Sequence, residues 1–254
     1  DPSVPEWIRL GCGNAEYYCE EKGATFPADE CPPTLPDLTE HTNYLATWVK
    51  ENPETYEEYK KLKTPGGVGL AKCMKIGMDA PKFPKCGLVA GDAECYEVFP
   101  KVFEYVIQTK HGLDLKGGAT HTTDMDASKL SSTPIDPSGK YVKSVRARTA
   151  RNLRGLPLPP ACTFEQRRKT EALIAGALKN LTGELAGEYF PLAGSTSYPG
   201  AMDAKKEEKL RSNGNLFQFP DGLLLLSSGC GRHWPDGRGI FHNKAENFFV
   251  WLNE

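Results

Sequence analysis

The first half of the chain carries apolar residues at helical spacing. Within residues 43–62 the apolar positions repeat at intervals of three and four, and the same spacing returns over residues 70–78 and 92–110. The pair His111-Gly112 follows, and glycine tolerates the left-handed conformation that ends many helices. The pattern therefore predicts a small all-helical domain over residues 43–116.

The second half of the chain mixes two periods. Residues 140–148 alternate between apolar and polar positions, which predicts a strand. Residues 164–181 follow the helical period, and Thr163 with Gln166 three residues later forms a capping-box pattern at the start. The apolar stripe predicted for this helix consists of Leu173, Ile174, Ala177, Leu178 and Leu181.

Two further strands are predicted near the end of the sequence. They cover residues 223–228 and 247–252, and residues 239–242 are expected to pair with the second of them as a hairpin. The predicted fold class is therefore α+β. In it, a small all-helical N-terminal domain precedes an α/β domain whose antiparallel sheet is incomplete.

Composition assigns the remaining segments. Residues 1–42 are rich in proline, glycine and acidic residues, which predicts an extended N-terminal arm. Residues 117–139 are rich in threonine, serine, glycine, aspartate and proline, which predicts a linker. The predicted organisation is thus an arm at 1–42, a helical domain at 43–116, a linker at 117–139 and an α/β domain at 140–254.

The overall composition is that of a globular protein. Hydrophobic residues make up 39% and charged residues 25% of the 254 positions. No stretch approaches the roughly 20 apolar residues of a membrane span, so no transmembrane segment is predicted. The isoelectric point near 6.3 argues against a nucleic-acid partner. Without a hydrophobic signal segment, we expect an intracellular protein, either trimmed at Asp1 or placed in an organelle after loss of a targeting peptide.

The eight cysteines do not form the close pairs of a zinc site. We interpret most of them as buried thiols. Cys12, Cys19 and Cys31 lie together in the N-terminal arm, where a disulfide bridge within the trio is the alternative to free thiols.

The segment with the clearest chemistry lies in the predicted strand at residues 140–148. Alternate side chains of a strand share a face, so Ser144, Arg146 and Arg148 would point the same way. Two guanidinium forks and a hydroxyl suit a phosphate chain, because each fork can donate to two oxygens. The alternative is an exposed strand with scattered arginines.

These residues also form part of a recognisable series of motifs. Ser-x-Arg-x-Arg at Ser144–Arg148 is followed by Arg151, and further motifs follow in order at residues 158–162, 181–192, 234–243 and 249–254. The series resembles the phosphagen kinases, which transfer the γ-phosphoryl group of ATP to a guanidino compound. Residues 89–99 are similar to the creatine kinase-like branch, which includes taurocyamine kinases.

The resemblance implies roles for particular residues. Ser144, Arg146 and Arg148 match the residues that hold the nucleotide phosphates, with ATP and Mg²⁺ as the cofactors. The loop that helps close over the guanidino substrate corresponds to Cys86, Gly87, Leu88 and Val89, and the glycines of residues 66–69 lie in a region linked to substrate size. No resident metal site is implied.

The catalytic set that the resemblance implies is incomplete in this sequence. Glu254 borders the family's catalytic acid motif, and the further phosphate-binding arginines of the family are absent. The segment expected near the adenine, residues 212–217, lacks the family's histidine. Phosphoryl transfer depends on positioning and on neutralising charge on the phosphate oxygens, so the sequence as given predicts an inactive chain.

Two hypotheses follow. In the first, the protein is a catalytically incomplete phosphagen-kinase-like chain, a structural or accessory subunit of a larger assembly. Its partners would be other protein subunits that cover the sheet edge formed by residues 248–252, because an uncovered edge strand promotes aggregation. In the second, the sequence is part of an active ATP:guanidino phosphotransferase of the creatine or taurocyamine kinase type.

Overall fold

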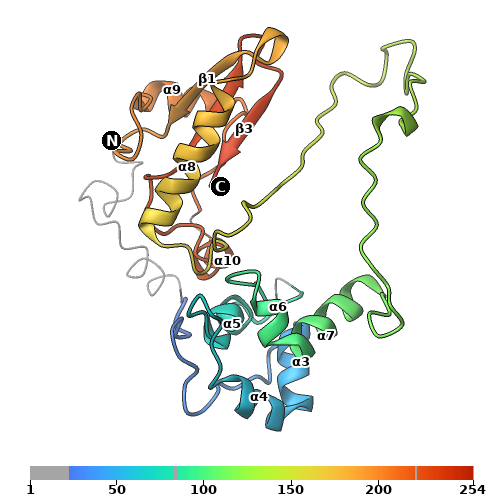
Figure 1. Ribbon diagram of the computed structural model, residues 1–254, viewed down its shortest axis with the longest axis vertical. Helices are drawn as coiled ribbons and strands as arrows, with labels where there is room; N and C mark the ends of the chain where they lie inside the picture. The colour runs from blue at the N-terminus through green and yellow to red at the C-terminus, as the bar shows by residue number, and fades with distance from the viewer. Residues whose placement is uncertain (1–22, 83–84, 221, 254) are drawn as a thin grey trace.

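The computed structural model describes residues 23–82, 85–220 and 222–253. In Figure 1 a group of helices occupies one half, and a sheet with a long helix across it occupies the other. The predicted α+β class is confirmed, whereas the predicted domain bounds stay predictions. Among the described residues, no helix has the length and apolar character needed to cross a membrane.

The helices of the first half form where the apolar spacing predicts them. They are α3 (Tyr44–Glu51), α4 (Pro53–Tyr59), α5 (Leu70–Asp79), α6 (Cys95–Val98) and α7 (Pro100–His111). The Asn43 side chain accepts a hydrogen bond from the Ala46 amide and so caps α3. Helix α7 ends at Gly112, whose φ of 66° is left-handed, as predicted.

One predicted helix is divided in two. Residues 92–110 give α6 and α7 rather than one helix, because Pro100 has no amide hydrogen to donate and starts a new helix instead. The residue at the break still contributes to the hydrophobic core. Phe99 at this position is completely buried and meets Tyr59 edge-to-face at 5.6 Å, and Trp48 stacks on Tyr59 at 6.1 Å.

A long connection joins the two halves. Residues 112–163 contain one described helical turn, the 3₁₀ helix η1 (Ala127–Lys129), and most of their side chains are exposed. Figure 1 shows this segment, in green to yellow, running away from α7 and returning to α8. The strand predicted at residues 140–148 is absent. A strand requires a hydrogen-bonded neighbour, and none of the described strands pairs with this segment.

Helix α8 (Phe164–Leu178) begins as predicted. The Thr163 side chain accepts from the Gln166 amide, and the Gln166 side chain accepts from the Thr163 amide. The predicted apolar stripe is only partly a core face, because Leu173 is 54% exposed whereas Ile174, Leu178 and Leu181 pack, partly buried, against the core of the sheet. The buried positions are Arg167, Glu171 and Ala175. Glu171 is buried on this face because it accepts a hydrogen bond of 2.7 Å from the Tyr189 hydroxyl of the sheet.

The sheet has three described strands in the order β1-β2-β3, all antiparallel. They are β1 (Gly187–Pro191), β2 (Gly239–Asn243) and β3 (Phe249–Leu252). The hairpin predicted from residues 239–242 and 247–252 is confirmed, with Phe241 opposite Val250. The smaller elements around the sheet are η2 (Gly183–Leu185) and α9 (Ala204–Ser212).

The strand predicted at residues 223–228 is instead the short helix α10 (Leu223–Ser227). A four-leucine run has no period of its own, so its neighbours decide its structure. Here the amide of Leu226 donates to the Gly222 carbonyl, and α10 packs against α5. The Ser227 hydroxyl donates to Asp79 at 2.8 Å, which ties the second half of the chain to the first.

The N-terminal cysteine trio lies only partly within the described residues. Among the described residues, Cys31 is a free, half-buried thiol. Cys12 and Cys19 lie outside the described residues. Burial raises the pKa of the Cys31 thiol, although its hydrogen bond with Tyr56 opposes the shift.

Candidate functional site

The structure brings Arg146 and Arg148 to one aromatic ring. Their guanidinium carbons lie 5.2 Å and 5.0 Å from the centre of the Trp251 ring on β3. Guanidinium groups are attracted to the electron-rich face of an indole, so both contacts are favourable. The two arginines therefore share a face, although the segment that carries them is not a strand.

Trp251 also connects this pair to the segment expected near the adenine. Its Nε1 donates to the Asn215 carbonyl at 2.7 Å, and Arg146 donates to the neighbouring Gly214 carbonyl at 2.9 Å. Phe217 meets the Trp251 ring edge-to-face at 5.8 Å. Three segments distant in sequence, residues 144–148, 214–217 and 249–252, thus form one site at the edge of the sheet.

The third predicted phosphate-binding residue, Ser144, and the arginine that follows the motif, Arg151, lie along the same extended segment. Ser144 is exposed two residues before Arg146. The guanidinium of Arg151 turns back to its own segment, where it donates to the Thr149 hydroxyl and the Ala150 carbonyl, both at 2.7 Å. The side chains of Arg146 and Arg148 remain exposed, so a phosphate chain has open access to them.

The predicted substrate loop belongs to the helical half. The carbonyl of Cys86 accepts from the Leu45 amide of α3 at 3.2 Å, and the amide of Val89 donates to the Cys73 carbonyl of α5 at 3.0 Å. Gly87 has a φ of 67°, and an added Cβ would lie 2.5 Å from the Asn43 carboxamide oxygen. Only glycine fits here, so backbone contacts with α3 and α5 fix the position of this loop.

The Trp-Pro-Asp-Gly-Arg-Gly motif builds the turn that precedes β2. Arg238 is completely buried and donates to the carbonyls of Cys230 and Arg232, at 2.6 Å and 2.8 Å. The Asp236 carboxylate accepts from the Thr196 amide at 2.6 Å. His242 has a structural position, since its Nδ1 lies 3.1 Å from the Asn243 carbonyl and its ring stacks on Phe190.

This turn also holds the end of β3. The Asn253 side chain donates to the Arg167 carbonyl at 3.1 Å and to the Gly237 carbonyl at 2.5 Å. Asn253 is thereby fixed one position before Glu254, the residue that borders the expected acid motif and lies outside the described residues. Sequence reasoning identified the motif but not this contact, because the contact joins positions far apart in the chain.

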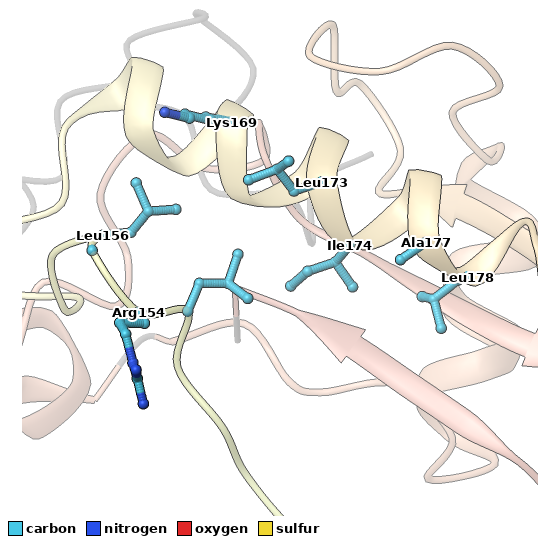
Figure 2. Close-up of a pocket in the computed structure, with 9 residues that line it drawn as sticks. Arg154, Leu156, Lys169, Leu173, Ile174, Ala177 and Leu178 are labelled. Carbon is cyan, nitrogen blue, oxygen red and sulfur yellow. The ribbon is translucent and has the colours of Figure 1, made fainter.

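An apolar cavity of about 470 Å³ lies beside α8. Figure 2 shows Leu173, Ile174, Ala177 and Leu178 on the helix facing Leu156 and the Arg154 segment. Four residues of the predicted apolar stripe therefore line this cavity, and two of them, Ile174 and Leu178, also pack against the core of the sheet. Lys169 and Arg154 are the charged members of the cavity.

Comparisons with known proteins match both halves of this arrangement. Residues 40–108 match the profile described as the ATP:guanido phosphotransferase N-terminal domain, and residues 169–254 match that of the C-terminal catalytic domain. The chain belongs to the ATP:guanido phosphotransferase family. The resemblance to phosphagen kinases is thereby confirmed. Within the described residues, no group of three or more His, Cys, Asp or Glu side chains is placed to hold a metal ion.

The relatives are named as kinases of different guanidino compounds. Glycocyamine kinase from Hediste diversicolor is 44% identical over 225 residues, which cover 87% of this chain and 54% of that protein. Creatine kinase M-type from Tetronarce californica is 41% identical over 227 residues, with 87% and 56% covered. The crystal structure of lombricine kinase superposes with a TM-score of 0.77 at 39% identity, with 87% and 57% covered. The chain thus spans little more than half the length of these relatives.

Proposed function

We propose that this chain binds the phosphates of ATP through Ser144, Arg146 and Arg148, as the nucleotide-binding part of an ATP:guanidino phosphotransferase. The observation that carries the proposal is the arrangement of Arg146 and Arg148 on the Trp251 ring, beside the carbonyls of Gly214 and Asn215. Two exposed guanidinium groups on a fixed aromatic platform can donate several charge-assisted hydrogen bonds to one phosphate chain.

The two arginines would perform part of the chemistry of the family. Transfer of a phosphoryl group needs the donor held in line and its oxygens neutralised, and guanidinium groups do both without giving up a proton. Mg²⁺ bound to ATP would supply further positive charge. The cofactor fits these residues, because the exposed arginine face has room for a polyanion.

The substrate class is a guanidino compound, and the helical half is its proposed binding side. The loop of Cys86, Gly87, Leu88 and Val89 is held by backbone hydrogen bonds to α3 and α5, so it presents a fixed shape. Such a shape can select among substrates that share the guanidino group but differ in the remainder. The reported relatives act, by their names, on creatine, glycocyamine and lombricine.

A calorimetric titration with MgATP tests the nucleotide proposal. The double variant Arg146→Ala, Arg148→Ala should lower ATP affinity by at least about 100-fold, because charged hydrogen bonds contribute about 1.5–3 kcal/mol each and two are removed. Lys143→Ala is the matched control. It removes a cation from the same exposed segment, where its Nζ bonds only the nearby Gly139 carbonyl at 2.7 Å, so it should bind ATP almost as the parent does. Unchanged affinity in the double variant would refute the phosphate assignment.

The accessory-subunit hypothesis makes a different prediction for catalysis. Incubation with MgATP and creatine, glycocyamine or taurocyamine should release ADP if the protein is an active phosphotransferase, and should release none if it is an accessory subunit. The intact mass of the native protein complements this assay. A mass near 28.0 kDa with no ADP release would favour the accessory role, whereas a substantially larger mass with turnover would favour the enzyme.

A further inference from the structure

Two buried cysteines face each other in the core of the helical half. Cys73 lies on α5 and Cys95 begins α6, and their sulfur atoms are 3.6 Å apart. Both side chains are fully buried, and both are free thiols. Nothing in the proposed phosphotransfer uses this pair.

A carboxylate completes the arrangement. The thiol of Cys95 donates to the Asp92 Oδ1 at 3.1 Å, while the Thr64 hydroxyl donates to the Asp92 Oδ2 at 2.5 Å. The amide of Cys95 donates to Oδ1 as well, at 3.0 Å. Asp92 is therefore fixed as the acceptor at the end of a chain that runs from Cys73 through Cys95.

The hydrogen bond between the two thiols shifts their pKa values in opposite directions. It raises the pKa of Cys73, with burial adding to the shift, and it lowers the pKa of Cys95. Cys95 is thus the sulfur that more readily becomes a thiolate, and the thiolate is the form that reacts. The hydrogen bond from the Cys95 thiol to the Asp92 carboxylate opposes this shift, because a carboxylate raises the pKa of a thiol that it contacts, but the bond between the thiols outweighs it.

A cavity of about 280 Å³ reaches the carboxylate side of the pair. Asp92 lines it together with Gly66 and Val68, and residues from the second half of the chain, including Leu156 and Gln166, form its other wall. A small oxidant in this cavity can therefore approach Asp92, which contacts the Cys95 thiol, although neither cysteine lines the cavity itself.

We propose that Cys73 and Cys95 form a reversible disulfide when the protein meets a hydroperoxide such as hydrogen peroxide. The Cys95 thiolate attacks one peroxide oxygen, which forms a sulfenic acid and releases hydroxide. The proton that Cys95 lost to Asp92 converts this hydroxide to water. The sulfur of Cys73 then attacks the Cys95 sulfur, and the displaced hydroxide takes the Cys73 proton as a second water.

The closing movement is small. A disulfide requires sulfurs about 2.05 Å apart, so the two must approach by roughly 1.5 Å. The four-residue helix α6 carries one of them, and a short helix can shift more easily than α5. The amide of Leu158 donates to the Gly91 carbonyl at 2.8 Å, so a shift near Asp92 would reach the contact between the two halves of the chain.

Peptide mapping of the full chain tests the proposal. The protein is oxidised with hydrogen peroxide, then denatured with an alkylating agent present, digested with trypsin and analysed by mass. Because Cys86 and Cys95 fall on one tryptic peptide, the Cys86→Ser variant is used to assign the bond. We expect a linked peptide containing Cys73 and Cys95, lighter by two hydrogen atoms than the free pair and separated by dithiothreitol.

Two further variants complete the design. Cys95→Ala and Cys73→Ala should each abolish the linked peptide, and thermal unfolding shows whether they remain folded. If either Ala variant does not fold, the test rests on the linked peptide found, or not found, in Cys86→Ser. Recovery of both Cys73 and Cys95 as alkylated thiols after oxidation of Cys86→Ser would overturn the proposal. So would a Cys73 link that persists in Cys95→Ala.

Discussion

Trp251 joins the arginine segment to the sheet, because its ring lies beneath two guanidinium groups while its Nε1 donates to Asn215. Each exposed cation–π contact contributes about 0.5–1 kcal/mol. We therefore expect Trp251→Leu to lower ATP affinity by roughly tenfold through loss of this platform. Trp251→Phe keeps an aromatic face and should retain most of the affinity. Calorimetric titration of both variants with MgATP tests this prediction. Equal ATP affinity for the Leu and Phe variants would contradict the platform role.

His233 gives the fold a sensitivity to acid. Burial, together with the charges of Arg167 and Arg232, lowers its pKa to about 4. The unfolded chain therefore takes up the proton first, and the stability contributed by neutral His233 is present above about pH 6.5 and is lost as the pH falls toward 4. We expect this loss to be roughly 1–2 kcal/mol, since the partly exposed ring is screened by solvent.

The test replaces this histidine with a residue that does not titrate. His233 has a φ of 61°, which asparagine tolerates well, so His233→Asn preserves the backbone. Chemical denaturation of parent and variant is compared between pH 7 and pH 4. The parent should lose more stability than the variant over this range. Parallel pH profiles would show that His233 does not cause the acid sensitivity.

At the scale of single elements, the start of α8 depends on one side chain. Thr163→Ala removes half of the capping box and should lower the free energy of unfolding by about 1 kcal/mol. This corresponds to a fall of about 2–4 °C in the melting temperature for a chain of this size. Thr170→Ala is the control, because Thr170 only bonds back to the Gln166 carbonyl within the helix. Equal melting temperatures for the two variants would argue against the cap.

Elements set by local chemistry could be predicted from the sequence, whereas elements set by distant neighbours could not. The cap at Thr163 and the left-handed end at Gly112 each depend on residues a few positions apart. Helix α10 and strand β1 depend on α5 and β2, which lie far away in the chain. The strand expected at residues 140–148 fails for the same reason, since alternation predicts a strand only where a partner strand is present.

The candidate site, too, could be predicted only in part from the sequence. The pattern at Arg146 and Arg148 identified two cations on one face, and the structure places both on one ring. Their platform, Trp251, is about a hundred residues later in the sequence, so spacing could not reveal it. The sequence feature closest to Trp251 was the family-like motif at residues 249–254. That motif predicted a strand but not which residues lie against it.

At the scale of the whole molecule, a polar contact joins the two halves. Asp79 at the end of α5 is almost completely buried, and it accepts from Ser227 of α10 at 2.8 Å, from Lys75 at 2.9 Å and from the Phe26 amide at 2.7 Å. A buried carboxylate with this many donors is costly to disturb. Ser227 is the one donor of the three that comes from the second half of the chain.

Removal of this hydroxyl therefore tests how strongly the halves stabilise each other. Ser227→Ala should cost about 1 kcal/mol, because Asp79 stays buried with one fewer donor, and the melting temperature should fall by about 2–4 °C. Ser228→Ala is the matched control, since the Ser228 hydroxyl bonds only nearby groups of its own segment, the Leu225 carbonyl at 2.8 Å and the Cys230 sulfur at 3.1 Å. In differential scanning calorimetry, the Ser227 variant should also show a broader transition as coupling weakens. Superimposable traces for the two variants would mean that the Ser227–Asp79 hydrogen bond contributes little to the coupling between the halves.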